Sequence, residues 1–356
     1  LALENGGEIG SITGYGSYGQ GNGVNSVQIS AENGATTTVN GSITKIDELI
    51  VDGDTTVTDR VAVNYLDLSA SLNTTAEKGS VHVNAADISE NAVLETNSFT
   101  IGNANGSRDS YRGNNVNVMG SITTGDLTLN ENAELDLFGG VVTAKNLTAS
   151  ATSDISVGYD PLSTIVENDP DTIYDDTKAY TGSLEITGQT KLNGAELYVD
   201  PVYGDRTALV SLNKLSGWTK ASPRFEGGVL DGSVFVGRNS ALGIGSDSLA
   251  TLQSKIARFQ NGVSLEDPQA NPDGVGAVLY LGNSFTLGAG ESLWLTALTS
   301  EGVREYYNAN NGTLADISST ANLNVLADTV YLGENTAIVV DAGVLENSSA
   351  MITLAG

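Results

Sequence analysis

Acidic side chains gather in one segment, residues 159–181, where their chemistry suits a metal ion. The segment YDPLSTIVENDPDTIYDDTKAYT contains Pro161 and Pro170, so it predicts a side loop rather than a regular strand. Carboxylate oxygens are the ligands that calcium prefers, but the spacing fits neither an EF-hand nor the glycine-rich calcium repeat of other solenoids. The candidate calcium ligands are Asp169, Asp171, Asp175 and Asp176. A solvated acidic loop without a cofactor is the alternative, and the sequence favours it.

Tyrosines crowd in and around the same segment and offer a second kind of chemistry. A flat ring can stack on the face of a sugar while its hydroxyl forms a hydrogen bond. Binding residues of solenoids commonly lie in loops that interrupt the repeats. The candidate ligand-binding residues are Tyr159, Tyr174, Tyr180, Tyr198 and Tyr203. We therefore predict the 159–181 loop as a contact region, with ordinary loop packing as the alternative.

Carboxylates on predicted strands raise the possibility of catalysis. Glycoside-cleaving enzymes need adjacent carboxylates on one face, with Arg or Lys beside them where the sugar is acidic. The candidates are Asp67, Asp87, Asp126 and Asp136. They are scattered along the chain with few basic companions, so we interpret them as outward residues on polar sheet faces. A polysaccharide-degrading enzyme stays as the catalytic alternative.

The chain has one histidine, His82, between Val81 and Val83. In a strand, alternate residues point to opposite faces, so inward valines place His82 outward. A Ser-His-Asp hydrolase would have to use this residue, but the sequence has no G-x-S-x-G motif. P-loop, dinucleotide-binding and HExxH motifs are also absent from the sequence. The sequence therefore predicts a protein that is not an enzyme.

Charge and composition exclude several classes of partner. The chain carries 43 acidic and 16 basic residues, for a net charge of −27, so we expect no binding to nucleic acid or to an anionic membrane surface. It has no cysteine, which excludes disulfides and thiolate metal sites. No apolar run of about 18 residues and no signal peptide appear in the sequence. We expect both ends to continue in a longer chain.

The elements that must position these residues are repeats of about 20 residues. An offset of 20 superposes Leu127 on Leu147, Thr128 on Thr148 and Leu129 on Ala149. Each copy holds two short alternating runs, which cannot bury an apolar face alone and must stack on neighbouring copies. The inward apolar column is predicted to run through Leu49, Leu68, Ile88, Leu127 and Leu147.

Asparagine and glycine mark the predicted corners between strands, because both tolerate a left-handed backbone. The corners are Asn91-Ala92, Asn132-Ala133, Gly194-Ala195, Asn239-Ser240 and Asn335-Thr336. One short helix interrupts the pattern, over residues 247–259, with Leu249, Leu252, Ile256 and Phe259 on one face. Ser246 or Asp247 is predicted to cap its start, and Gly262 to follow its end. We expect this helix to pack sideways on the solenoid or over an open end.

The predicted fold is therefore all-β: a parallel β-helix (β-solenoid) with coils of about 20 residues, side loops and one short helix. Residues 1–38 are predicted to form a Gly-rich entry or first coil. Residues 39–356 are predicted to form a single solenoid, with insertions at 103–115, 159–181 and 246–276.

Two phrases, GDLTLNENAELDLFGG (125–140) and VYLGENTAIVVDAG (330–343), resemble the coils of autotransporter passenger domains, the surface-exposed parts of Gram-negative type V secreted proteins. The resemblance covers roughly residues 39–356. It implies a right-handed β-helix that is extracellular, at the bacterial cell surface and outer membrane. In that family the membrane is reached only through a C-terminal β-barrel, which this sequence lacks, so the chain is expected to be a passenger segment.

The resemblance also implies a role. Passenger domains commonly act in adhesion, including biofilm and virulence functions, so we expect an adhesin segment that attaches to a host-surface glycan or protein, or to its own copy. The structural alternative is a stalk without a ligand of its own, which only holds other parts of the protein away from the cell.

Overall fold

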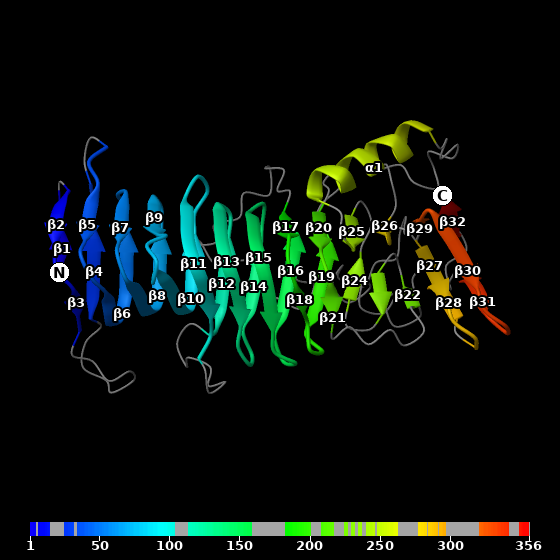
Figure 1. Cartoon of the computed structure of the whole chain (residues 1–356), viewed down its shortest axis with the longest axis horizontal. Helices are drawn as coiled ribbons and strands as arrows, with labels where there is room; N and C mark the ends of the chain where they lie inside the picture. The colour runs from blue at the N-terminus through cyan, green and yellow to red at the C-terminus, as the bar shows by residue number, and fades with distance from the viewer. Residues whose placement is uncertain are drawn as a thin grey trace, which may run out of the picture. The chain divides into compact units, whose positions relative to one another are not determined.

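The computed structural model consists almost entirely of short strands that stack in parallel along the chain, and it confirms the predicted parallel β-solenoid (Figure 1). It describes residues 1–356 apart from residues 5, 15–24, 32–33, 104–112, 159–181, 201–207, 217–223, 227–228, 232–233, 237–239, 246–247, 263–276, 283, 291, 297–319, 342–348 and 356. The chain forms two compact units, which are described separately below. The first unit is Leu1–Ser156 with Ser183–Ala195, and the second is Val157–Gly182 with Glu196–Gly356.

Strands β1 to β18 belong to the first unit, and β16 extends two residues past Ser156 into the second. They are β1 (Ala2–Leu3), β2 (Gly7–Ile9), β3 (Ile12–Thr13), β4 (Ser26–Ile29), β5 (Thr37–Val39), β6 (Ile43–Val51), β7 (Thr55–Val57), β8 (Arg60–Leu68), β9 (Ser71–Thr74), β10 (Ser80–Ile88), β11 (Val93–Ile101), β12 (Asn115–Val118), β13 (Ser121–Leu129), β14 (Glu134–Leu137), β15 (Val141–Ala149), β16 (Asp154–Gly158), β17 (Ser183–Ile186) and β18 (Thr190–Lys191). The predicted N-terminal segment thus contributes strands to the same stack, since β1 pairs with β4 and β4 with β6.

The first unit has three faces, because the chain bends three times in each coil and each bend starts a new ladder of parallel pairs. The first face contains β5, β7 and β9, followed by the first halves of β11, β13 and β15. The second face contains the first halves of β6, β8 and β10, followed by the second halves of β11, β13 and β15. The third face contains the second halves of β6, β8 and β10, then β12 and β14.

The pairing confirms the predicted offset of 20 in one part of the chain and corrects it in another. Leu127 pairs with Leu147, Thr128 with Thr148 and Leu129 with Ala149, as predicted. The predicted apolar column is wrong before this point, because Leu49 pairs with Leu66 instead of Leu68. A shift of two residues keeps the same side chains pointing inward, so alternation alone does not reveal it.

The same column also changes face where the prediction treated it as continuous. Ile88 pairs with Val118 on the third face, whereas Leu127 pairs with Phe99 on the second. The two residues of the Phe99 and Leu127 pair lie 28 positions apart in the chain, which is longer than the 20 between Leu127 and Leu147. The extra length fits the predicted insertion at 103–115, of which residues 104–112 lie outside the described part.

The predicted corners have the left-handed backbone that their asparagines suggested. Positive φ angles occur at Asn91 (72°), Asn132 (57°), Asn193 (51°) and Asn335 (57°), and at Gly194 (96°). The alanines that follow are buried, with Ala92 at 1% exposure and Ala133 and Ala195 at 0%. Asn239 lies outside the described residues. The Asn-Ala pair occurs at two different corners of the coil, because Asn91 precedes a strand of the first face and Asn132 precedes a strand of the third face.

The second unit repeats the three-faced design. Its strands are β19 (Glu196–Asp200), β20 (Ala208–Leu212), β21 (Leu215–Ser216), β22 (Arg224–Glu226), β23 (Val229–Asp231), β24 (Val234–Val236), β25 (Ser240–Ile244), β26 (Ala277–Tyr280), β27 (Ser284–Leu287), β28 (Ser292–Thr296), β29 (Thr320–Leu326), β30 (Thr329–Leu332), β31 (Ala337–Asp341) and β32 (Ser349–Ala355). Parallel ladders join β20, β25, β26, β29 and β32 on one face, β27 and β30 on another, and β22, β28 and β31 on a third.

Helix α1 (Leu249–Gly262) packs sideways on the first of these ladders, as one of the two predicted placements had it. Leu252 and Ile256 join a buried cluster with Leu209, Ala241 and Val278 of the strands, which confirms the predicted apolar face in the described half of the helix. The cap is corrected, because the Thr251 backbone N–H donates to Ser248 Oγ at 3.3 Å. Gly262 is the last helical residue instead of the first after the helix.

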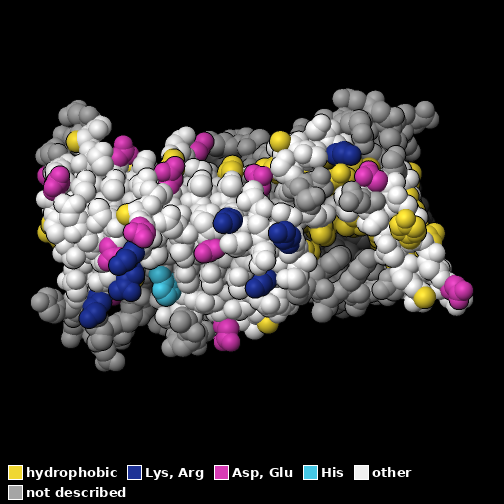
Figure 2. All heavy atoms as spheres, in the orientation of Figure 1, with side chains coloured by type: hydrophobic (Ala, Val, Ile, Leu, Met, Phe, Trp, Pro, Cys, Tyr) yellow, Lys and Arg dark blue, Asp and Glu magenta, His cyan; other side chains and the backbone are white. Residues whose placement is uncertain are grey.

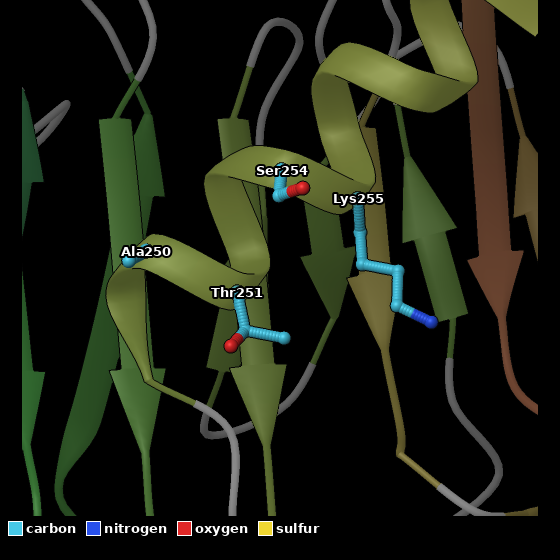
Figure 3. Close-up of a pocket in the computed structure, with 4 residues that line it drawn as sticks. All are labelled: Ala250, Thr251, Ser254 and Lys255. Carbon is cyan, nitrogen blue, oxygen red and sulfur yellow. The ribbon is translucent and has the colours of Figure 1, made fainter.

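A hollow of about 330 Å³ lies beside α1 (Figure 3). It is lined by Ala250, Thr251, Ser254 and Lys255, and Lys255 reaches from the helix toward the strands. The Lys255 ammonium lies 5.1 Å from the ring centre of Tyr280, which is a cation–π distance. Tyr280 is only 5% exposed, so the helix covers an aromatic residue that points away from the solenoid core.

Asn324 of β29 is buried at 1% exposure, and neither its amide nitrogen nor its carbonyl oxygen has a hydrogen-bond partner in the described structure. Its neighbours in register are Val278 and Thr353. Replacing Asn324 with the isosteric leucine removes two unpaired polar atoms, so we expect the free energy of unfolding to rise by about 1 to 3 kcal/mol. Urea titration followed by tryptophan fluorescence measures this, because both tryptophans lie in the second unit.

The control for this variant is Asn117→Leu on the third face of the first unit. The Asn117 amide donates to Asp87 Oδ1 at 2.8 Å, so the same substitution there should lower stability. A stability of Asn324→Leu equal to or below that of the original protein would contradict the prediction.

Candidate functional site

Most of the predicted site residues lie outside the described part of the structure. They are Tyr159, Tyr174, Tyr180, Tyr203, Asp169, Asp171, Asp175 and Asp176. The predictions of a calcium site and of a contact loop at 159–181 therefore stay predictions. Within the described residues, no group of three or more His, Asp or Glu side chains is arranged to hold a metal ion.

Tyr198 is the predicted ligand-binding tyrosine that the structure describes, and its side chain is buried. Its side chain is 6% exposed, between Leu197 and Val199, which are both fully buried. Its hydroxyl donates to a carboxylate oxygen of Glu196. The described structure therefore does not present this ring at the surface, and the prediction of ligand binding by Tyr198 stays a prediction.

Three of the four candidate carboxylates stand in one column on the third face, which the sequence did not predict. Asp67 and Asp87 are neighbours in register, and Asn117 separates Asp87 from Asp136. Asp87 accepts hydrogen bonds at both oxygens, from the Tyr65 hydroxyl and from the Asn117 amide. Asp136 lies on the outer side of the sheet, between the inward Leu135 and Leu137, but it is only 3% exposed and accepts from the Asn115 amide at 2.8 Å.

Asp126 lies on the second face, where the Asn146 amide donates to its Oδ1 at 2.8 Å. Neutral donors on other strands bond to Asp87, Asp126 and Asp136. These carboxylates therefore join adjacent coils, which is a structural role. Asp87, with both oxygens already accepting, is poorly placed to serve as a proton donor or as a nucleophile.

A groove of about 350 Å³ crosses the second face of the first unit near the bend to the third face. Its floor is formed by Thr44, Ala62 and His82, which are direct neighbours in register on β6, β8 and β10. Ala62 has the smallest side chain of the three, so the floor is lowest at β8. A small residue between two larger ones in register thus contributes to the groove.

His82 points outward from the sheet, as predicted, since Val81 and Val83 are 1% and 0% exposed. Its Nε2 lies 2.8 Å from the Gly102 carbonyl oxygen. A carbonyl can only accept, so Nε2 carries the proton and the hydrogen bond fixes the orientation of the ring. Nδ1 is then the ring nitrogen left to meet a ligand.

Lys45 lies beside the groove because strand β6 contains one extra residue. The register passes from Thr44, paired with Ala62, directly to Ile46, paired with Val63, which leaves Lys45 in a bulge. Its φ is 58°, a left-handed value that is uncommon for lysine. Gly14 lies against this bulge, where a Cβ atom would stand 2.1 Å from the Lys45 carbonyl oxygen. Backbone strain of this kind costs about 1 to 3 kcal/mol and is typical of functional positions.

A chain of amide hydrogen bonds lines the other side of the groove. Asn84 donates to Asn64 Oδ1 at 3.1 Å, and Asn64 donates to Asp47 Oδ1 at 3.1 Å. The other oxygen of Asp47 accepts from the Asn25 backbone N–H at 2.9 Å. These amides are therefore held in fixed orientations, one in each successive coil, and Asn103 extends the lining by a further coil.

The groove concentrates positive charge on an acidic protein. Lys45 and Arg60 are both exposed and both line it, and neither is paired with a carboxylate of the described residues. Figure 2 shows Lys and Arg side chains gathered beside the histidine, toward the lower left of the view. This site was not predicted from the sequence, although Lys45 interrupts the alternation of apolar residues and Asn64 lies 20 residues before Asn84.

Comparison with protein-family models, with curated proteins and with solved structures finds no match for this chain. The described helix is also too short to cross a membrane. The geometry of the groove is therefore the main guide to function.

Proposed function

We propose that the chain is a segment of a bacterial surface adhesin of the autotransporter type, which binds a glycan on a host cell through the groove on its second face. The observation that carries the proposal is the groove itself, where fixed amides and exposed cations surround a floor residue as small as Ala62. Hydrogen-bonding groups in a shallow depression suit a ligand rich in hydroxyl groups. The carboxylates of the third face, which are engaged between coils, support binding rather than catalysis.

Filling the groove tests the proposal. We expect the purified chain to bind members of a glycan array, and we expect Ala62→Phe to weaken that binding at least about tenfold, because the new ring occupies the groove floor. The control is Thr128→Phe, since Thr128 is an outward residue of the same face that does not line the groove. Binding that both variants leave unchanged would show that the groove is not the site, and silence on every array would favour the stalk.

Self-association stays as the second candidate. Sedimentation of the same protein separates it from glycan binding.

A further inference from the structure

We propose that the ligand of the groove is an acidic saccharide, whose carboxylate or sulfate is bound by Lys45 and Arg60 and whose hydroxyl groups are bound by the amide of Asn64 and by Nδ1 of His82. This inference rests on the proposed function and specifies its ligand class. The shared chemistry is an oxyanion carried on a sugar ring.

The cations of the groove select for an anion. Among the lining residues that the structure describes, Lys45 and Arg60 provide two full positive charges, against a single carboxylate, Asp47. Both oxygens of Asp47 already accept hydrogen bonds, so this carboxylate is committed to the sheet and to the amide chain. An arginine guanidinium forms paired, charge-assisted hydrogen bonds with a planar oxyanion, and a lysine adds a mobile point charge.

The net charge of −27 does not prevent this binding. At physiological ionic strength, exposed charges are screened over about 8 Å, so an anion in the groove responds mainly to the nearest side chains. The long-range field of the protein slows the approach of an anion but does not cancel contacts within the groove.

The amides and the histidine favour a saccharide over an acidic peptide. Asn64 and His82 are half-buried in the groove, and an amide both donates and accepts, as sugar hydroxyls do. Buried Asn84 donates to Asn64 Oδ1 and so fixes the orientation of that amide. An extended peptide usually binds a sheet through its free edge. Strand β8 pairs with β6 on one side and β10 on the other, so its backbone groups are already used.

The bulge at Lys45 gives the site its second, independent feature. Ordinary alternation would place the residue after Thr44 on the inner side of the sheet. The extra residue brings a lysine to the groove at a cost in backbone strain, and Gly14 leaves room for it. Backbone strain lowers stability, so stability does not explain a lysine in this conformation beside the groove. Ligand binding does explain it.

Matched saccharides test the inference. The probes are a uronic-acid oligosaccharide, the same oligosaccharide with its carboxylates reduced to neutral hydroxymethyl groups, a sulfated saccharide, and polyglutamate. Isothermal titration should show binding to the uronate or to the sulfated probe, at least about tenfold weaker binding to the carboxyl-reduced one, and weaker binding as salt rises. Lys45→Gln and Arg60→Gln should each weaken binding of the anionic probe about tenfold or more.

The control variant is Lys145→Gln, which makes the same charge change at an exposed lysine of the first unit outside the groove, and it should bind as the original protein does. The inference would be overturned if the protein bound the neutral oligosaccharide as tightly as the anionic one and if Lys45→Gln and Arg60→Gln left this binding unchanged. If Ala62→Phe also abolished the binding, the proposed function would still stand. If Ala62→Phe binds every probe as the original protein does, both the inference and the proposed function would be overturned. Polyglutamate binding as tight as that of the anionic saccharides would overturn the saccharide class.

Discussion

Replacing Phe99 with alanine is expected to lower the free energy of unfolding of the first unit by about 3 to 5 kcal/mol. Phe99 is fully buried and is among the largest buried side chains of the described core. It lies between Val81 of the preceding coil and Leu127 of the following one. Its removal leaves a cavity that neighbouring aliphatic residues, themselves fixed in a ladder, cannot close.

The solenoid makes this effect local as well as large. Each coil contacts mainly the coils before and after it, so lost contacts weaken the stack where they occur. Hydrogen exchange read by mass spectrometry should therefore show faster exchange in β10, β11 and β13 first. Thr128→Ala, an outward change on the neighbouring strand, should leave both stability and exchange nearly unchanged. A loss below about 1 kcal/mol in Phe99→Ala would mean that the ladder repacks around the gap.

The fold was largely predictable because its signals are local. Alternation, the offset between Leu127 and Leu147, and the left-handed asparagines each follow from the geometry of a strand or a corner. The register before residue 100 was not predictable from the same signals. The coil from Leu49 to Leu66 is 17 residues long and that from Leu66 to Ala86 is 20, and both keep apolar residues inward.

The candidate site was less predictable, because it depends on register and on a backbone irregularity. Once Thr44, Ala62 and His82 are known to be neighbours, the hollow follows from the size of Ala62. The predictions from sequence relied on carboxylates and tyrosines, because these residue types are common in binding and catalytic sites. The structure shows that such a residue can instead be structural, as Asp87 between coils demonstrates.

Replacing Leu252 with aspartate is expected to detach helix α1 from the sheet of the second unit, with a stability loss of at least about 4 kcal/mol. Leu252 is fully buried and lies against Gly243, whose hypothetical Cβ would stand 3.4 Å from Leu252 Cδ2. Leu252→Ala removes only packing and should cost about 2 to 5 kcal/mol. The aspartate adds the cost of burying an unpaired carboxylate, which the site cannot offset.

Helix detachment has a consequence that separates it from simple unfolding of the helix. Strands β20, β25 and β26 present Leu209, Ala241 and Val278 to α1, so these apolar side chains become exposed when it leaves. Leu252→Asp should therefore bind a hydrophobic dye and aggregate more readily, while Gln253→Asp, at an exposed position of the same turn, should do neither. If Leu252→Asp keeps the original stability and binds no dye, the helix does not serve as the cover of this sheet face.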